Sequence, residues 1–287
     1  MTDDLLKSNV LTKKNETQLE PPLEDSLKDF FKQKTTDITL PLVQYFDDQQ
    51  AVRTGPKVDT YKLSTTQRET LVGLMLGDGH LVPSTAKHNR NNPATYRLVL
   101  LQSDAHKDYL FHLYEIFKGL TRTGPRYYEF LDNRNPGKVY KRWSFSTILQ
   151  PCLRFYGQQF YQYDKINDKY CRKVPNNIGR LLEARSLAYW YMDDGAAKWH
   201  GRSLALRYCT DNFTLKEVHC LMVCLKTKFG LDCSAQKKGK NYRIYVKQNS
   251  YYKIKNLMFS YLVPSMVHKF PKEYEILKKD SRSAIPQ

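Results

Sequence analysis

Two apolar runs that end in the same way constrain the fold of this chain. The run "LVGLMLGDG" occupies residues 71–79 and "LAYWYMDDG" occupies residues 187–195, and both end in Asp-Gly. In each run the apolar residues recur at helical spacing, and Asp78 and Asp194 fall on the same stripe one turn further on. Each run therefore predicts a helix whose buried face ends in a carboxylate.

A carboxylate in this position is unfavourable. It is costly at the end of a buried stripe unless it meets a cation, a donor or water, and the helix dipole disfavours an anion at a C-terminus. One Asp-Gly pair is more typical of an ordinary exposed helix stop. Two pairs at matching offsets indicate a shared purpose, because a divalent metal would reverse both penalties.

Two glycines in the first run suggest how the acids meet. Gly73 and Gly77 are four residues apart, so one edge of the predicted helix lacks side chains and another backbone can approach closely. If the two helices pack together, Asp78 and Asp194 emerge side by side. Paired carboxylates with backbone carbonyls make an all-oxygen site for Mg²⁺, which is suited to phosphodiester hydrolysis.

The order of predicted elements after the first run is repeated after the second. Each half reads as a helix, strand, helix, hairpin and helix and then ends in Lys-x-Pro. The first half contains a helix from 64 to 79, a strand at 96–103, a helix at 103–120, a hairpin at 126–147 and a helix at 148–161. The second half contains a helix ending at 195, a strand at 203–210, a helix at 213–230, a hairpin around Gly239 and a helix at 250–262. We predict three segments: an N-terminal extension at 1–60, a first subdomain at 61–180 and a second at 181–287.

Charge is distributed unevenly along the chain. The 287 residues contain 46 Lys+Arg against 29 Asp+Glu, a net charge of +17, with 21 tyrosines. Residues 1–60 hold 8 basic and 11 acidic residues, which leaves 38 against 18 for the remainder. A basic and aromatic composition is typical of nucleic-acid binding, since Lys and Arg displace counterions from phosphates. Residues 1–60 lack a core pattern and are predicted to be flexible, with no secretory signal.

Two other partners are less well supported by the sequence. There is no apolar stretch of transmembrane length and no basic amphipathic helix, so we predict no membrane partner. The six cysteines include no C-x-x-C pair. Cys220 and Cys224 share a helix face and, with Cys209 and Cys233, could form a zinc site. Their spacing on an apolar helix is more typical of core thiols in a reducing compartment.

The hairpin strands are the predicted nucleic-acid surface. Alternation places polar side chains on one face of each hairpin and apolar ones on the other, and a two-stranded ribbon fits the major groove. A solvated polar face is the alternative interpretation. We predict DNA contacts from Arg97, Tyr140, Arg142, Arg207, Asn241, Arg243, Tyr245 and Lys247.

Both apolar runs resemble the LAGLIDADG motif. Over about residues 61–275 the chain resembles single-chain, two-motif homing endonucleases encoded in organellar introns, in particular the mitochondrial omega-intron type, which is also suggested by "VPNN" and "FT-x-x-EV". The resemblance implies an α+β fold of two pseudo-symmetric αββαββα subdomains. Their motif helices form the central contact, and two antiparallel, saddle-shaped sheets bind double-stranded DNA. It also implies a monomer, located in a mitochondrion or chloroplast, that makes Mg²⁺-dependent double-strand breaks with 3′ overhangs at a long, asymmetric target.

The resemblance also assigns residues to roles. Asp78 and Asp194 match the final acid of the motif, as catalytic residues and metal ligands. Gly77 and Asp193 stand where family members offer backbone carbonyls to the metal, and the Asp193 side chain is interpreted as a local hydrogen-bonding group. The family also places a basic residue beside each centre. The catalytic candidates for that role are Lys269 in "HKFP" and, in "CRKVP", Lys173 or its neighbour Arg172.

The second motif departs from the family pattern, and other functions stay open. Tyr189, Trp190 and Tyr191 stand where smaller residues are usual, which predicts an asymmetric helix contact. One alternative function is an RNA maturase that assists splicing of intron RNA. Another is a non-catalytic nucleic-acid-binding protein whose motif helices serve only as an interface. Both acids and both Lys-x-Pro segments are present, which favours the nuclease.

Overall fold

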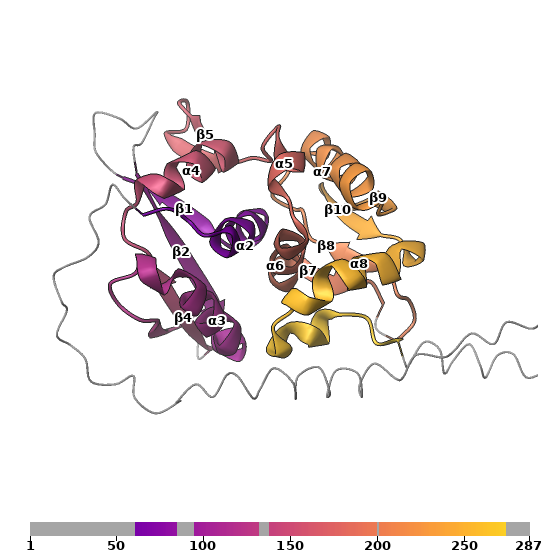
Figure 1. Ribbon diagram of the computed structural model, residues 1–287, viewed down its shortest axis with the longest axis horizontal. Helices are drawn as coiled ribbons and strands as arrows, with labels where there is room; N and C mark the ends of the chain where they lie inside the picture. The colour runs from indigo at the N-terminus through magenta and orange to yellow at the C-terminus, as the bar shows by residue number, and fades with distance from the viewer. Residues whose placement is uncertain (1–60, 85–94, 132–137, 200, 274–287) are drawn as a thin grey trace, which may run out of the picture. The chain divides into compact units, whose positions relative to one another are not determined.

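The computed structural model describes residues 61–84, 95–131, 138–199 and 201–273 (Figure 1). The predicted N-terminal extension at 1–60 and the last residues of the predicted second subdomain, 274–287, lie outside the described residues. Within the described part no helix is long and apolar enough to cross a membrane.

The described chain runs twice through the same order of elements. The first half contains α2 (Thr65–Leu76), β1 (His80–Pro83), β2 (Tyr96–Ser103), α3 (Lys107–Phe117), β3 (Arg126–Leu131), β4 (Val139–Ser146) and α4 (Arg154–Phe160). The second half contains α6 (Ala184–Asp194), β7 (Gly195–Ala197), β8 (Leu206–Tyr208), α7 (Leu215–Phe229), β9 (Cys233–Lys238), β10 (Asn241–Val246) and α8 (Tyr251–Met258). The sheets are antiparallel, with strand orders β1-β2-β4-β3 and β7-β8-β10-β9. The predicted αββαββα repeat is confirmed in both halves.

The division into two subdomains stays a proposal. Its boundary, between residues 180 and 181, falls within the short helix α5 (Ile178–Leu181), which packs on α7 of the second half.

Local sequence signals explain where two of the helices begin. Ser64 caps α2: its hydroxyl accepts the Gln67 N–H at 3.1 Å, and the Gln67 side chain accepts the Ser64 N–H at 3.0 Å. Thr214 and Glu217 form the same capping box at the start of α7, which ends at Gly230 with φ of 63°. Because a capping box satisfies backbone donors that the first turn leaves free, both starts were predictable from sequence.

The two motif helices form the centre of the fold. Figure 1 shows α2 and α6 side by side between the two sheets. A Cβ added at Gly73 would lie 2.5 Å from the Ser186 carbonyl oxygen and 2.9 Å from the Tyr189 Cβ. Only glycine allows this approach of the two backbones, as the sequence predicted.

The three bulky residues of the second motif are shared between the two halves. Trp190 and Tyr191 turn into the second half, where their ring centroids lie 4.1 and 5.5 Å from that of Tyr208 on β8. Tyr189 turns the other way and stacks on His112 of α3 at 6.0 Å. The contact is therefore asymmetric: Gly73 of α2 faces the backbone of α6 and its bulky Tyr189.

A hairpin between α4 and α5 was not predicted. The chain from 148 to 161, which we expected to be helical, forms a 3₁₀ turn and the short α4, and then enters β5 (Tyr161–Asp164) and β6 (Lys169–Arg172). Gly157, inside α4, allows the helix to pack closely on Tyr96, because a Cβ added at Gly157 would lie 2.5 Å from the Tyr96 ring. The hairpin matters because β6 carries Arg172 towards the first motif.

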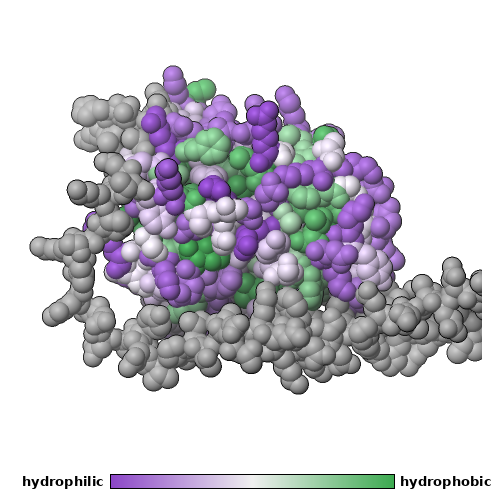
Figure 2. All heavy atoms as spheres, viewed as in Figure 1, coloured by the Kyte–Doolittle hydropathy of each residue, from purple (hydrophilic) through white to green (hydrophobic). Residues whose placement is uncertain are grey.

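Hydrophobic side chains are also found at the surface. In Figure 2 hydrophobic residues show between the hydrophilic side chains of the described part. On the edge strand β3, Tyr128, Phe130 and Leu131 have exposed fractions of 47%, 40% and 67%. Aromatic side chains on an exposed sheet are unusual in an isolated protein and suit a surface that a partner covers.

Candidate active site

Asp78 and Asp194 stand at the ends of the two paired helices. Asp78 lies in the turn after α2 and is exposed, whereas Asp194 is the last residue of α6 and is half-buried. Burial, followed by the negative charge of Asp78, raises the pKa of Asp194 to about 7, against the lowering effects of Lys269 and Arg172. The two carboxylates therefore lie within electrostatic reach of each other, as the repeated Asp-Gly ending predicted.

Gln102 contacts the first acid and was missed by the sequence analysis. It lies on β2, is 9% exposed, and its side-chain amide donates to Asp78 Oδ2 at 3.3 Å. The strand alternation places Gln102 with Leu98 and Leu100 on the buried face. A polar residue at a core position was the one available signal, since buried polar groups are kept only when they are bonded.

Asp193 turns its side chain into the contact between the halves. Its Oδ2 accepts the Asp78 N–H at 2.9 Å, and its Oδ1 accepts the Tyr109 hydroxyl at 2.8 Å. Burial, followed by the charge of Asp78, raises the pKa of Asp193. The side chain thus acts as the hydrogen-bonding group that the sequence suggested, and only its backbone carbonyl is left as a metal ligand candidate.

Two cations bind the carbonyl groups at the helix ends. The guanidinium of Arg172 donates to the carbonyls of Gly77 and Gly79. The ammonium of Lys269 donates to the carbonyls of Met192 and, at 2.8 Å, Asp193. Burial lowers the pKa of Lys269, while the three nearby aspartates raise it.

The structure brings Arg172, and not the predicted Lys173, to the first motif. Arg172 ends β6, and Lys173 follows it with its main-chain N–H bonded to the Phe160 carbonyl at 2.8 Å. Because successive side chains of an extended chain point to opposite sides, only one of two neighbours can reach Gly77. The choice depends on the unpredicted hairpin, so residue spacing could not make it.

The predicted nucleic-acid residues of the first sheet share one face. Residues paired directly across a sheet project to the same side. The register pairs Arg97 with Val82, Tyr140 with Phe130, and Arg142 with Ser103. All of these residues project from one face of the sheet. The buried Leu98 and Phe145 project from the other face. The Arg142 guanidinium also lies 4.5 Å from the Phe130 ring centroid, so cationic and aromatic groups meet on this face.

The second sheet repeats this arrangement. Tyr245 pairs with Arg207, and Asn241 and Arg243 share their side of β10, whereas Ile244 and Val246 are buried on the other. Arg243 is held by Asp211, whose Oδ1 accepts its Nε–H at 2.8 Å. Lys198, which was not predicted, joins the same face with its ammonium 4.9 Å from the Tyr245 ring centroid.

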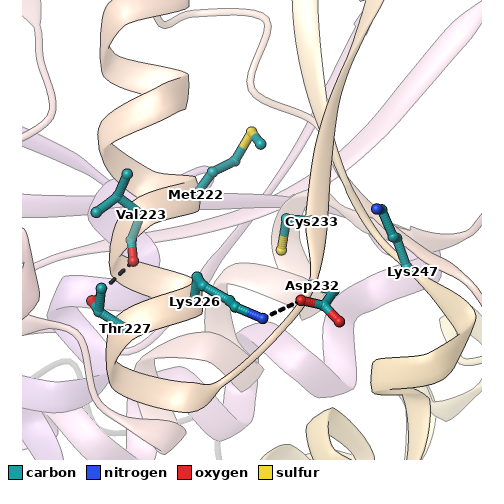
Figure 3. Close-up of a pocket in the computed structure, with 7 residues that line it drawn as sticks. All are labelled: Met222, Val223, Lys226, Thr227, Asp232, Cys233 and Lys247. Atoms are coloured by element: carbon teal, nitrogen blue, oxygen red, sulfur yellow. Dashed lines mark hydrogen bonds and ion pairs between the residues drawn. The ribbon is translucent and has the colours of Figure 1, made fainter.

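Lys247 lies directly after the end of β10. The strand β10 ends at Val246, and Lys247 lines a hollow between α7 and β9 (Figure 3). Figure 3 shows Met222 and Val223 on one wall of the hollow, and the ammonium of Lys226 joined to Asp232. Lys247 is still extended and its N–H bonds the Asp232 carbonyl at 2.8 Å, so it continues the alternation of β10 but stands at the end of the row, where it also lines this hollow.

Comparison with known proteins identifies the family. Residues 68–254 match the LAGLIDADG DNA endonuclease family. The chain belongs to this family. The DNA endonuclease I-ChuI of Chlamydomonas applanata is 35% identical over 214 residues, which are 72% of this chain and 95% of the relative. The cytochrome b mRNA maturase bI2 of Debaryomyces hansenii is 30% identical over 206 residues, 70% of this chain and 72% of that relative.

A solved structure supports the same assignment. The homing endonuclease I-WcaI bound to its DNA recognition sequence matches with a TM-score of 0.64 and 25% identity, over 76% of this chain and 95% of that one. The LAGLIDADG fold, with its two motif helices and two antiparallel sheets, is therefore the fold of this chain.

The cysteines of this LAGLIDADG protein do not form a metal centre in the described residues. All six are free, and within that part of the chain no group of three or more His, Cys, Asp or Glu side chains could hold a metal ion. Burial raises the pKa of Cys224, which is expected of a core thiol. Any metal at the motif acids would thus share two carboxylates with backbone, water or substrate oxygens.

Proposed function

We propose that the chain is a site-specific homing endonuclease that makes double-strand breaks with 3′ overhangs at a long, asymmetric DNA target and requires Mg²⁺. The observation that carries this proposal is the pairing of Asp78 with Asp194 at the ends of the LAGLIDADG helices, where burial, followed by the charge of Asp78, raises the pKa of Asp194. Family membership supports the same reaction class. Because a single chain holds both motifs, a monomer is sufficient.

The donor set fits a hard divalent cation. Two carboxylates that repel each other are stabilised by a cation between them, and Mg²⁺ takes oxygen ligands while keeping several waters and substrate phosphates. Asp78 and Asp194 would hold it, with the carbonyl oxygens of Gly77 and Asp193 as further candidates, since a carbonyl has a second lone pair beside the one bonded to Arg172 or Lys269. When bound, the cation supplies an activated water and stabilises the leaving oxygen.

The protein's own residues then position the phosphodiester. Arg172 and Lys269 are fixed by backbone carbonyls beside the two acids, so their positive charge does not need to reorganise as negative charge develops on the phosphate. Gln102 orients the Asp78 carboxylate through its amide. Asp194 must lose its proton before it can hold a cation, and its raised pKa makes that step sensitive to pH near neutrality.

The outward faces of the two sheets would bind the duplex. Their arginines and tyrosines suit phosphate and base-edge contacts, and the net charge of +17 favours a polyanion. The residues proposed for this role are Arg97, Tyr140, Arg142, Arg207, Asn241, Arg243 and Tyr245, with Lys198 added and Lys247 removed.

Cleavage of selected DNA tests the proposal. Purified full-length protein is incubated with Mg²⁺ and a randomised duplex library, and cut ends are sequenced to define the target. We expect Asp78→Asn and Asp194→Asn to lower cleavage by more than about a hundredfold while target affinity stays within about threefold. Asp108→Asn, at an exposed position in the first turn of α3, is the matched control and should cut normally. Normal cutting by the two motif variants would remove the metal assignment.

A second function is favoured by one observation, the 30% identity to a cytochrome b mRNA maturase. We infer an organellar location on the same ground and on the family resemblance. If the chain assists splicing, the transcript of its host intron should splice faster in vitro with the protein present, and Asp78→Asn should leave that effect intact. An unchanged splicing rate would dismiss the maturase function.

A further inference from the structure

The contact between the LAGLIDADG helices contains a carboxylate that the proposed chemistry does not use. Asp193 is 9% exposed and belongs to the second half, but its carboxylate accepts hydrogen bonds from two groups of the first half. Its Oδ1 accepts the Tyr109 hydroxyl of α3 at 2.8 Å, and its Oδ2 accepts the Asp78 N–H at 2.9 Å. A buried carboxylate is costly, so two fixed donors at this place indicate a specific purpose.

Gly77 makes this arrangement possible. A Cβ on Gly77 would lie 2.5 Å from both the Cβ and the Oδ2 of Asp193. Glycine therefore leaves the space that the Asp193 carboxylate occupies, and it brings that carboxylate against the peptide that carries Asp78. The hydrogen bond to the Asp78 N–H fixes the plane of this peptide, from which the Asp78 side chain projects.

The two motif acids are held in different ways. Asp194 is still within α6, so its N–H is taken up by the helix itself. Asp78 lies beyond the last residue of α2, and Gly77 before it has the non-helical φ of −102° and ψ of −129°. Asp78 thus has no helical turn to orient it, and the Asp193 carboxylate provides the bond that a helix would otherwise make.

We propose that Tyr109 and Asp193 are positioning residues that orient Asp78, so that their loss slows the cut of one DNA strand more than the cut of the other. The inference rests on the proposed endonuclease function. Asp193 acts here as a hydrogen-bond acceptor and not as a charged metal ligand. Tyr109 acts through Asp193, because its hydroxyl fixes the carboxylate in the orientation that meets the Asp78 N–H.

Strand-resolved cleavage tests this role. The target duplex carries a different label on each strand, and single-turnover rates are measured at saturating protein with Mg²⁺. We expect Tyr109→Phe to slow one strand about tenfold and the other less than twofold, so that nicked DNA accumulates while affinity for the target is unchanged. Equal slowing of both strands, or wild-type rates on both, would overturn the proposal.

Tyr189→Phe is the matched control. Tyr189 is also a buried tyrosine at this contact, and its hydroxyl bonds His112 at 2.7 Å instead of Asp193. Its removal also costs the interface a hydrogen bond of a tyrosine hydroxyl, without touching the Asp78 peptide. We expect the control to cut the two strands at an unchanged ratio; a strand bias like that of Tyr109→Phe would mean that general loosening of the contact is responsible.

Substitution of Asp193 distinguishes a role as a hydrogen-bond acceptor from a role as a charged metal ligand. Asparagine can still accept the Asp78 N–H and can donate its amide to the Tyr109 oxygen, so Asp193→Asn should cut both strands within about threefold of wild type. Asp193→Ala should reproduce the strand bias. If Asp193→Asn is as inactive as Asp194→Asn, the carboxylate charge is required and the positioning role is wrong.

Hydrogen exchange gives a readout that does not depend on cleavage. In the metal-free protein the Asp78 amide should exchange at least about tenfold faster in Asp193→Ala than in wild type, and at the wild-type rate in Tyr189→Phe. A wild-type protein that fails to cut DNA would refute the proposed function while the exchange measurement still decides the anchoring. An Asp78 amide that exchanges equally in all three proteins would refute the anchoring alone.

Discussion

Arg172 and Lys269 bind the backbone carbonyls at the two LAGLIDADG helix ends, one in each half of the molecule. Arg172 spans the carbonyls of Gly77 and Gly79 with its planar guanidinium, and Lys269 reaches those of Met192 and Asp193 with a single ammonium. The two cations are not interchangeable, because a guanidinium binds two acceptors in a fixed fork and stays charged when buried. The halves therefore differ in chemistry where their acids match.

The first prediction separates Arg172 from its neighbour. Arg172→Ala should lower the Mg²⁺-dependent cleavage rate by about a hundredfold, because it removes a fixed positive charge beside Asp78. Lys173→Ala should leave the rate within about threefold of wild type. Both are measured on the target duplex under single-turnover conditions. A larger loss for Lys173→Ala than for Arg172→Ala would restore the assignment made from residue spacing.

The second prediction concerns the close approach of the motif helices. Gly73→Ala should lower the free energy of unfolding by about 2 kcal/mol or more, because the new methyl would lie 2.5 Å from the Ser186 carbonyl oxygen and the helices must separate. Gly179→Ala is the control, since its nearest neighbour would be 3.9 Å away. Urea unfolding followed by circular dichroism measures both, and equal stabilities would argue against a tight contact at Gly73.

The third prediction compares two lysines of the second half. Lys198→Ala should weaken DNA binding several-fold, because its ammonium lies on the outward face beside Tyr245. The slope of log affinity against log salt concentration should fall by about one, since about one counterion fewer is released. Lys247→Ala should change neither, because Lys247 lines the hollow beside α7. Binding is measured by fluorescence anisotropy from low to moderate salt. Loss of affinity in Lys247→Ala alone would show that the duplex extends around the end of β10.

The fourth prediction concerns pH. Burial, followed by the charge of Arg185, lowers the pKa of His112 from 6.5 to about 4. The folded protein therefore keeps His112 neutral where the unfolded chain binds a proton, so this contribution to stability is complete above about pH 6.5 and is lost as the pH falls towards 4. The shift corresponds to about 3 kcal/mol. His112→Gln should lose less stability than wild type between pH 7 and pH 4, and identical profiles would contradict a buried neutral imidazole.

Much of the fold was predictable because it depends on patterns of residues that are close together in the sequence. The capping residue Ser64, the glycine stripe through Gly73 and the alternation along β4 and β10 each depend on neighbours in sequence, and the structure has all of them. The pairing of the acids was also predictable. Asp78 and Asp194 stand at matching offsets in the two repeats, and this is visible in the sequence without knowing where any side chain points.

The remaining features depend on contacts between distant segments. Arg172 is chosen over Lys173 by the register of a hairpin that the sequence does not signal, and Tyr109 reaches Asp193 from a helix in the other half. Gln102 was missed because alternation reports which face is buried and not which buried residue meets an acid. Lys247 also lines a hollow beside α7, which the periodicity of β10 does not signal.

The fit of Gly77 against Asp193 has a consequence for how the halves recognise each other. Two copies of α6 facing one another would bring two Asp193 carboxylates and two Tyr189 side chains to the same place, whereas α2 offers glycine at both positions. Only the pairing of α2 with α6 places a glycine against each of these larger side chains. The two halves are thus complementary at this contact, and the second half could not make the same contact with another copy of itself.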